Sequence, residues 1–185
     1  MLYIAIVLQA WYELEIAVEI GGTYEDMRTH SSARFSPLIR GHTWYGVAKS
    51  NAQLRLIDPQ YGFTTPLASF LAVSFDDNII THTTMYPHTE LLLLDDALTV
   101  VLDLQEQWRQ GGWINKKQKP FPSFADTPQW RAQLRDVNKG GQTFWYAGDK
   151  YQATLEMDRF KDHKRPEEER YKIILSVGKP WTPYP

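Results

Sequence analysis

The feature that most constrains the fold is a two-residue alternation of apolar and polar side chains. It occurs in three separate segments, 13–20, 151–158 and 171–177. Such alternation places the apolar side chains on one face of a β-strand and the polar ones on the other. The first segment ends at Gly21-Gly22, and a charged stretch, 161–170, separates the last two. We therefore expect half-buried strands, the last two joined in a hairpin by a long solvated loop.

Further strands are predicted in the first half of the chain. Segments 42–48 and 52–57 have strand composition and are separated by turn residues, 49–51. Segments 67–75 and 79–86 flank Asp77-Asn78, residue types that tolerate the left-handed backbone of a tight hairpin tip. The acidic tip lacks the glycine and distal glutamate of a calcium loop, so a hairpin is favoured over a cation site. Segment 23–34 is polar and is expected to be a loop or a further strand.

Two helices are predicted. Segment 91–111 has apolar residues at helical spacing, with Asp95 as the expected N-cap and Gly111-Gly112 as the stop. The following Trp113 is expected to fold back onto the core. A second helix starts after Asp126 or Thr127, with Pro128 in the first position, where a missing N–H has no cost. Its apolar residues at i, i+4 and i+7 are expected to face inward, namely Trp130, Leu134 and Val137.

Together these elements predict an α+β fold. We expect an antiparallel sheet of about six to eight strands, with two helices packed on one face. Residues 13–178 are expected to form a single domain, and the proline-rich tail 179–185 to lack regular structure. The chain has 185 residues and can therefore bury a substantial core.

The N-terminal segment 1–12 is almost entirely apolar and allows two interpretations. It is shorter than the roughly 20 residues of a membrane-spanning helix, and it lacks the charged start and cleavage site of a secretory signal. One interpretation is a buried first strand or helix. The other is the end of a membrane anchor whose natural start lies further upstream, with Trp11 and Tyr12 at the membrane interface.

Composition excludes several classes of function. The net charge is −2, and no basic stripe interleaved with aromatic residues is present, so we expect no nucleic-acid partner. The absence of cysteine excludes thiol catalysis, disulfides and cysteine-based zinc sites. The sequence contains no recognisable catalytic, phosphate-binding or dinucleotide motif, and none of the five histidines has metalloprotease spacing. We expect no catalytic residues, no cofactor and no metal.

The aromatic content is unusually informative, because 14% of the residues are aromatic and seven are tryptophan. Core packing, a carbohydrate-stacking platform and a protein interface are three competing explanations. Protein interfaces are anchored by tryptophan, tyrosine and arginine. The candidate interface anchors are Trp44, Tyr45, Trp113 and Trp181.

One combination of motifs resembles a known group of proteins. It comprises the turn 61–66, the leucine-rich entry 91–94 into a helix that exits at 108–113, and the segment 145–149 before the last strand pair. These motifs are similar to those of membrane-anchored, periplasmic immunity proteins of type VI secretion effectors, and the similarity covers roughly 61–177. The resemblance implies a non-enzymatic domain that blocks a toxin by binding it, and it transfers no functional residue.

The leading functional hypothesis is therefore an immunity protein that neutralises a secreted antibacterial toxin by covering its active site. Its partner would be the cognate toxin, and its location the periplasm, anchored to the inner membrane, with the cytoplasm as the alternative. A second hypothesis is an envelope-associated carbohydrate- or peptidoglycan-binding module that uses exposed tryptophans. A third is an enzyme without a recognisable motif, which would require a cleft where groups such as His82, His88 and Asp76 converge.

Overall fold

The computed structural model describes residues 13–115 and 121–181. Within these residues the helices are α1 (Tyr24–His30), α2 (Leu94–Gln110) and α3 (Pro128–Arg135). The strands are β1 (Glu15–Val18), β2 (Thr43–Val47), β3 (Gln53–Leu56), β4 (Phe63–Thr64), β5 (Phe70–Asp76), β6 (Ile79–Tyr86), β7 (Ile114–Asn115), β8 (Gly141–Ala147), β9 (Tyr151–Phe160) and β10 (Arg170–Gly178). The predicted α+β fold class is confirmed.

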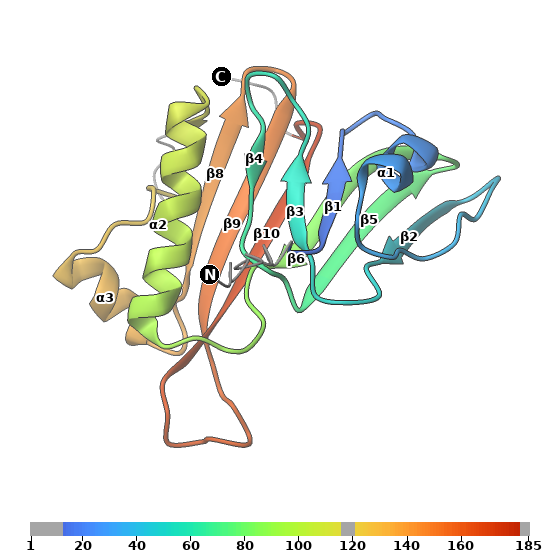
Figure 1. The fold of residues 1–185 in the computed structure, drawn as a ribbon. Coiled ribbons are helices and arrows are strands. Elements are labelled where there is room, and N and C mark those ends of the chain that lie inside the picture. The colour runs from blue at the N-terminus through green and yellow to red at the C-terminus, as the bar shows by residue number, and fades with distance from the viewer. Residues whose placement is uncertain (1–12, 116–120, 182–185) are drawn as a thin grey trace, which may run out of the picture.

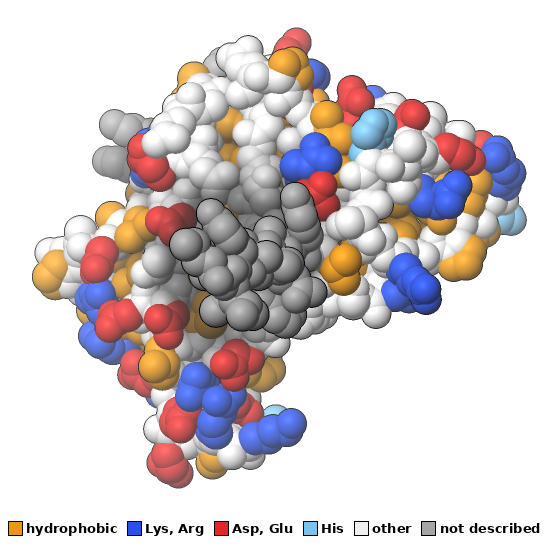
Figure 2. All heavy atoms as spheres, viewed as in Figure 1, with side chains coloured by type: hydrophobic (Ala, Val, Ile, Leu, Met, Phe, Trp, Pro, Cys, Tyr) orange, Lys and Arg blue, Asp and Glu red, His pale blue; other side chains and the backbone are white. Residues whose placement is uncertain are grey.

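A seven-stranded sheet forms one layer of the molecule (Figure 1). Its strand order is β2-β5-β6-β10-β9-β8-β7, and every neighbouring pair is antiparallel. The predicted hairpin tip is confirmed, because Asp77 has a φ of 52° between β5 and β6. The predicted β9–β10 hairpin is also confirmed. Figure 2 shows acidic and basic side chains interspersed on its loop, where Arg165 Nε lies 2.9 Å from Asp162 Oδ2.

The second layer combines a small sheet with helices. Its strands lie in the order β1-β3-β4, and β1 and β3 are parallel. Figure 1 shows α2, β4, β3, β1 and α1 side by side in front of the large sheet. We call the large-sheet face that meets this layer the inner face. Alternate residues of β9 and β10 on the inner face are buried, among them Leu155, Ile173 and Leu175.

Apolar burial against the inner face holds the two layers together. The small sheet contributes Ile16, Val18 and Leu54, all fully buried. Helix α2 contributes one apolar stripe, as its spacing predicts, and Trp108 on that stripe packs against Trp145 of β8 at a centroid distance of 5.5 Å. Each large side chain removed from water in this way contributes roughly 1.5–3 kcal/mol.

Three local predictions are corrected by the structure. Segment 23–34 contains helix α1, capped by Thr23, whose side chain accepts a hydrogen bond from the Asp26 backbone N–H. This helix has only seven residues, so its apolar residues are too few to reveal a helical period in the sequence. The residue preceding α2 is Leu93, which makes no side-chain capping bond, so Asp95 lies in the first turn instead. Val137 lies beyond the end of α3 and is 65% exposed.

The apolar segment 1–12, which carries both interpretations of the N-terminus, lies outside the described residues. Among the helices of residues 13–115 and 121–181, none is long and apolar enough to cross a membrane.

A buried carboxylate joins the two layers at one end. Asp58 follows β3, and its side chain is only 2% exposed. It accepts hydrogen bonds from Lys150 Nζ and from Tyr151 Oη at 2.9 Å, both at the β8–β9 turn, and from the backbone N–H groups of Gln60 and Tyr61. Burial opposes ionisation, but these four donors outweigh it and hold the pKa of Asp58 at about 2.

We expect Asp58→Asn to lower the free energy of unfolding by about 2 kcal/mol at pH 7, because the depressed pKa stabilises the folded state. The ionised Asp58 contributes this stability in full above pH 3.8, the ordinary pKa of an aspartate. The contribution is lost as the pH falls from 3.8 to about 2. Urea unfolding at pH 7 and pH 3 measures it. The difference in the free energy of unfolding between wild type and variant should be smaller at pH 3 than at pH 7. An equal difference at both pH values would contradict the lowered pKa of Asp58. Lys150→Met, which removes only the half-exposed donor, should cost less.

Candidate functional site

The face of the large sheet opposite α2 and the small sheet carries the candidate site, and we call it the outer face. Its central side chains on β6 and β10 are half-buried, including Thr84, Tyr86 and Ser176. In register with them on β9 lie Thr154, which is buried, and Glu156, which is half-buried. A strand exposes alternate residues to opposite faces, so the apolar inner residues of the same strands position these polar ones outward.

Two adjoining pockets form a groove on this face. The first, beside α3, has a volume of about 370 Å³, and the second, beside Trp181, has a volume of about 420 Å³. They share Gln142 and Glu156, so we treat them as one feature, the outer groove. The α3 end is lined further by Phe121, Trp130, Gln133, Lys139, Gly140, Gly141 and Asp158. The Trp181 end is lined further by His82, Phe144, Thr154, Ser176 and Trp181.

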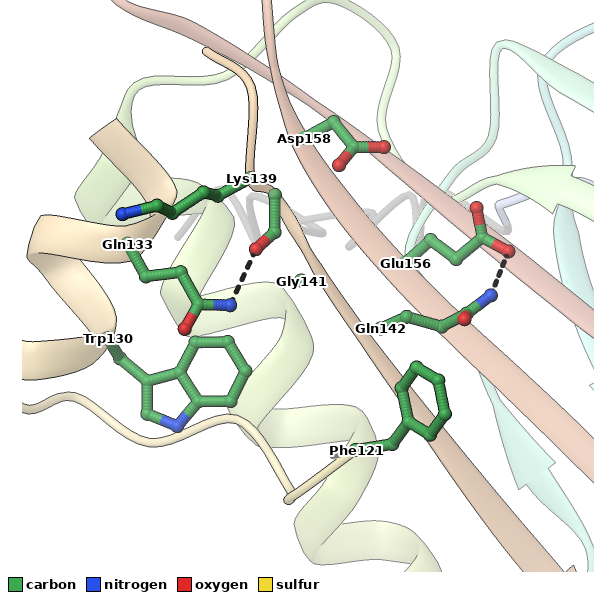
Figure 3. Close-up of a pocket in the computed structure, with 9 residues that line it drawn as sticks. Phe121, Trp130, Gln133, Lys139, Gly141, Gln142, Glu156 and Asp158 are labelled. Carbon is green, nitrogen blue, oxygen red and sulfur yellow. Dashed lines mark hydrogen bonds between the residues drawn. The ribbon is translucent and has the colours of Figure 1, made fainter. Parts of the chain in front are cut away.

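The α3 end is built around two glycines. Gln133 Nε2 donates to the Gly140 carbonyl at 2.8 Å, which joins α3 to the start of β8 (Figure 3). Gly140 has a φ of +56°, and a Cβ at this position would lie 1.7 Å from Asp158 Oδ1. Only glycine allows both this backbone conformation and this close approach of the carboxylate. The strand start therefore presents bare backbone between the aromatic rings and the carboxylates.

Two carboxylates lie on one side of these glycines. Glu156 and Asp158 are two residues apart on β9, so their Cα atoms are separated by about 7 Å. Glu156 Oε1 accepts a hydrogen bond from Gln142 Nε2 at 2.7 Å. Asp158 makes no hydrogen bond or ion pair within residues 13–115 and 121–181. Burial raises the pKa of Asp158, the charge of Glu156 raises it further, and Lys172 opposes both.

The nearby ammonium groups are directed elsewhere. Lys139 Nζ lies 3.1 Å from Asp136 Oδ2, and Figure 3 shows its side chain extending toward α3, away from Glu156 and Asp158. Lys172 Nζ lies 3.9 Å from the ring centroid of Tyr86. The α3 end of the groove is therefore acidic and rich in hydrogen-bond acceptors.

The Trp181 end is polar with one exposed indole. The Trp181 backbone N–H donates to Gln152 Oε1 at 3.1 Å, while the side chain of Trp181 remains 51% exposed beside His82. Burial lowers the pKa of His82, so this imidazole is neutral at physiological pH. The Thr154 hydroxyl is buried and has no hydrogen-bond partner among the described residues. A buried hydroxyl without a partner costs about 1–3 kcal/mol, and a ligand in the groove would supply one.

The structure separates the four aromatic residues chosen from the sequence. Trp44 is 9% exposed and stacks on Phe75 at a centroid distance of 4.4 Å, and Trp113 is 3% exposed. Both belong to the core, and this burial removes them from the candidate interface anchors. Tyr45 is 69% exposed on the outer face, in register with Ser74, which pairs in turn with His82. Tyr45 and Trp181 therefore both lie on this face.

The groups considered for catalysis do not converge. His88 Nε2 accepts the backbone N–H of Ile173 at 3.1 Å, a structural role. Asp76 lies at the far end of the β5–β6 hairpin, opposite Ile79, and His82 contacts Thr84. Within the described ranges, no three His, Asp or Glu side chains are placed to hold a metal ion. Sequence reasoning missed Gln142, Glu156 and Asp158, because polar residues alternating on a strand indicate only a solvated face.

Comparisons with known proteins found no match: no family model, no curated protein and no solved structure matches this chain.

We expect Asp158→Asn to stabilise the protein at pH 7 by no more than a few tenths of a kcal/mol, because the charge it removes is disfavoured by burial and by Glu156 but solvent screens most of this effect at an exposed residue. A raised folded-state pKa means that the folded protein binds the extra proton, so wild-type stability falls as the pH rises from 3.8 through that pKa. The variant should lack this decline. Urea unfolding between pH 3 and pH 7 measures the difference, and Asp103→Asn on the exposed side of α2 is the matched control. A destabilised Asp158→Asn protein would contradict the assignment.

Proposed function

We propose that the protein is a non-enzymatic binding protein, specifically an immunity protein that neutralises a secreted antibacterial toxin by covering its active site. The observation that carries the proposal is the outer groove, an acidic and aromatic depression on a sheet face that the second layer leaves uncovered. Its side chains are arranged to accept hydrogen bonds and to offer aromatic surface, which are the properties of a recognition surface.

The dimensions of the outer face suit a protein partner. Seven strands at a spacing of about 4.8 Å give a sheet roughly 29 Å wide. A stable protein interface buries about 800 Å² on each partner, which requires a surface of this breadth. Tyr45 and Trp181 supply exposed aromatic anchors on the same face, and residues of this type contribute most of the binding energy in such interfaces.

The charge of the groove favours a basic partner surface. Within the described residues Glu156 and Asp158 form no ion pair: Lys139 pairs with Asp136, and Lys172, which lies opposite Asp158 on β10, places its Nζ over the Tyr86 ring. Acidic groups placed against a basic cleft would fill it and exclude an anionic substrate. The proposed location remains the periplasm, with anchoring to the inner membrane through the N-terminal segment, and the cytoplasm remains the alternative. The resemblance to type VI immunity proteins supports the same assignment.

The test is affinity capture from the native host, followed by co-expression. The full natural gene product, tagged at its C-terminus, should retain one stoichiometric protein partner that is toxic when expressed alone and harmless when co-expressed. Tyr45→Ala/Trp181→Ala should weaken the complex several hundred-fold, since each anchor contributes about 2 kcal/mol, or about 30-fold. The control is Leu93→Ala, an exposed apolar residue at the start of α2. Neutralisation that the double variant leaves unchanged would exclude the outer face as the binding surface.

A carbohydrate-binding module is the second candidate, and one observation favours it. The exposed indole of Trp181 lies in the same pocket as Gln142 and Glu156, a combination of ring face and hydrogen-bonding groups that also suits a sugar. Peptidoglycan fragments should then quench tryptophan fluorescence saturably, and Trp181→Ala should abolish the effect. Retention on cell-wall material without any protein partner would replace the immunity proposal with this one.

A further inference from the structure

The outer groove has spare hydrogen-bond acceptors at three alternate positions of one strand. Thr154, Glu156 and Asp158 alternate along β9 and therefore face the groove together. Glu156 uses one carboxylate oxygen for Gln142, and Asp158 makes no hydrogen bond or ion pair in the described part of the chain. Thr154 is 6% exposed, and its hydroxyl is without a partner there. The unsatisfied Thr154 hydroxyl is an observation independent of the two acids.

Aromatic rings flank the acidic end of the same groove. Trp130 lies across the Gly140-Gly141 backbone from the two carboxylates, and Phe121 lies beside Gln142 (Figure 3). Phe121 is held there by an edge-to-face contact with Phe144 at 5.0 Å. A site that combines carboxylates with aromatic faces is suited to a planar cation rich in N–H donors, because such a group pairs with carboxylates and stacks on rings.

We propose that the outer groove binds an extended, arginine-bearing segment of the partner protein, with the guanidinium over the bare Gly140-Gly141 backbone, between the Trp130 ring on one side and Glu156 and Asp158 on the other. The inference rests on the proposed function, since it specifies the partner surface that the groove receives. The groove crosses β8, β9, β10 and β6, a width of about 14 Å, which an extended segment of about five residues spans. Beyond the arginine, a polar group of that segment pairs with the Thr154 hydroxyl, and its aliphatic atoms cover the Trp181 ring.

The first experiment uses the full chain and a defined probe, the blocked pentapeptide acetyl-Gly-Gly-Arg-Gly-Gly-amide. Titration followed by ¹H–¹⁵N NMR should give saturable shifts of the Trp130 indole N–H and of the Gly140 and Gly141 amides. The same peptide with citrulline in place of arginine has nearly the same shape but no charge, and it should bind tenfold more weakly or worse. Equal binding of the two peptides, equal binding of a lysine peptide, or the absence of saturable shifts would overturn the proposal.

Charge-matched variants locate the site. Glu156→Gln/Asp158→Asn should reduce affinity for the arginine peptide at least tenfold. The control Glu167→Gln/Asp103→Asn makes the same change of charge at two exposed positions, in the β9–β10 loop and on α2, and should leave affinity within twofold. A similar loss of affinity in both variants would mean that net charge alone attracts the peptide. That result would contradict the placement of the binding site at Glu156 and Asp158. Dispersed amide spectra and unchanged melting temperatures establish that both variants are folded.

A third variant separates binding from structure. Thr154→Val keeps the side-chain shape and removes the hydroxyl, so the free protein should be as stable as the wild type or more stable. Affinity for the arginine peptide should nevertheless fall several-fold. Unchanged affinity, or a loss of stability, would show that the hydroxyl serves the fold and would overturn its role in the groove.

The two proposals fail separately. If a toxin is captured and neutralised while the arginine peptide does not bind, the arginine assignment is wrong and the immunity proposal stands. If the peptide binds with the expected dependence on Glu156 and Asp158 while no toxin is neutralised, the groove assignment stands and the immunity proposal is wrong.

Discussion

Burial of only one face of the seven-stranded sheet is the constraint on which the other features depend. Helix α2 and the β1-β3-β4 sheet both pack on the inner face, where alternate residues of β9 and β10 are fully buried. Because side chains alternate across a strand, every inward apolar residue forces its neighbour outward. The apolar residues Leu155 and Met157 thereby place Glu156 on the opposite face. The core thus determines the positions, although not the identities, of the groove residues.

The elements that could be predicted from the sequence are those determined by local patterns. The β5–β6 and β9–β10 hairpins and helix α2 follow from alternation, turn chemistry and helical periodicity over neighbouring residues. The parallel β1–β3 pair joins segments nearly 40 residues apart, with a helix and β2 between them, and no local pattern reports such a pairing. Helix α1 was missed for a different reason, since seven residues contain fewer than two full turns.

The candidate site was only partly predictable, and Trp44 and Tyr45 show why. Adjacent residues of a strand point to opposite faces, so these two could not both be surface anchors once 42–48 was assigned as a strand. The structure places the ring of Trp44 on Phe75 and leaves Tyr45 in water. Which of the two is buried depends on where the second layer packs, and that is a property of the whole fold. Glu156 and Asp158 gave no signal, because a charged residue on a solvated strand face and one in a groove look alike in a sequence.

The groove and the core differ in what they contribute to stability, and this difference bears on function. Asp58 is ionised, buried and surrounded by four donors, so its charge stabilises the connection between the layers. Among the described residues Asp158 has no donor and Thr154 is buried without a partner, so both lower the stability of the free protein, Asp158 only slightly because it is exposed. A fold secured elsewhere can carry such costs, and a partner that supplies the missing donors recovers them as binding energy. The same independence would allow groove residues to change with the partner while the inner face stays the same.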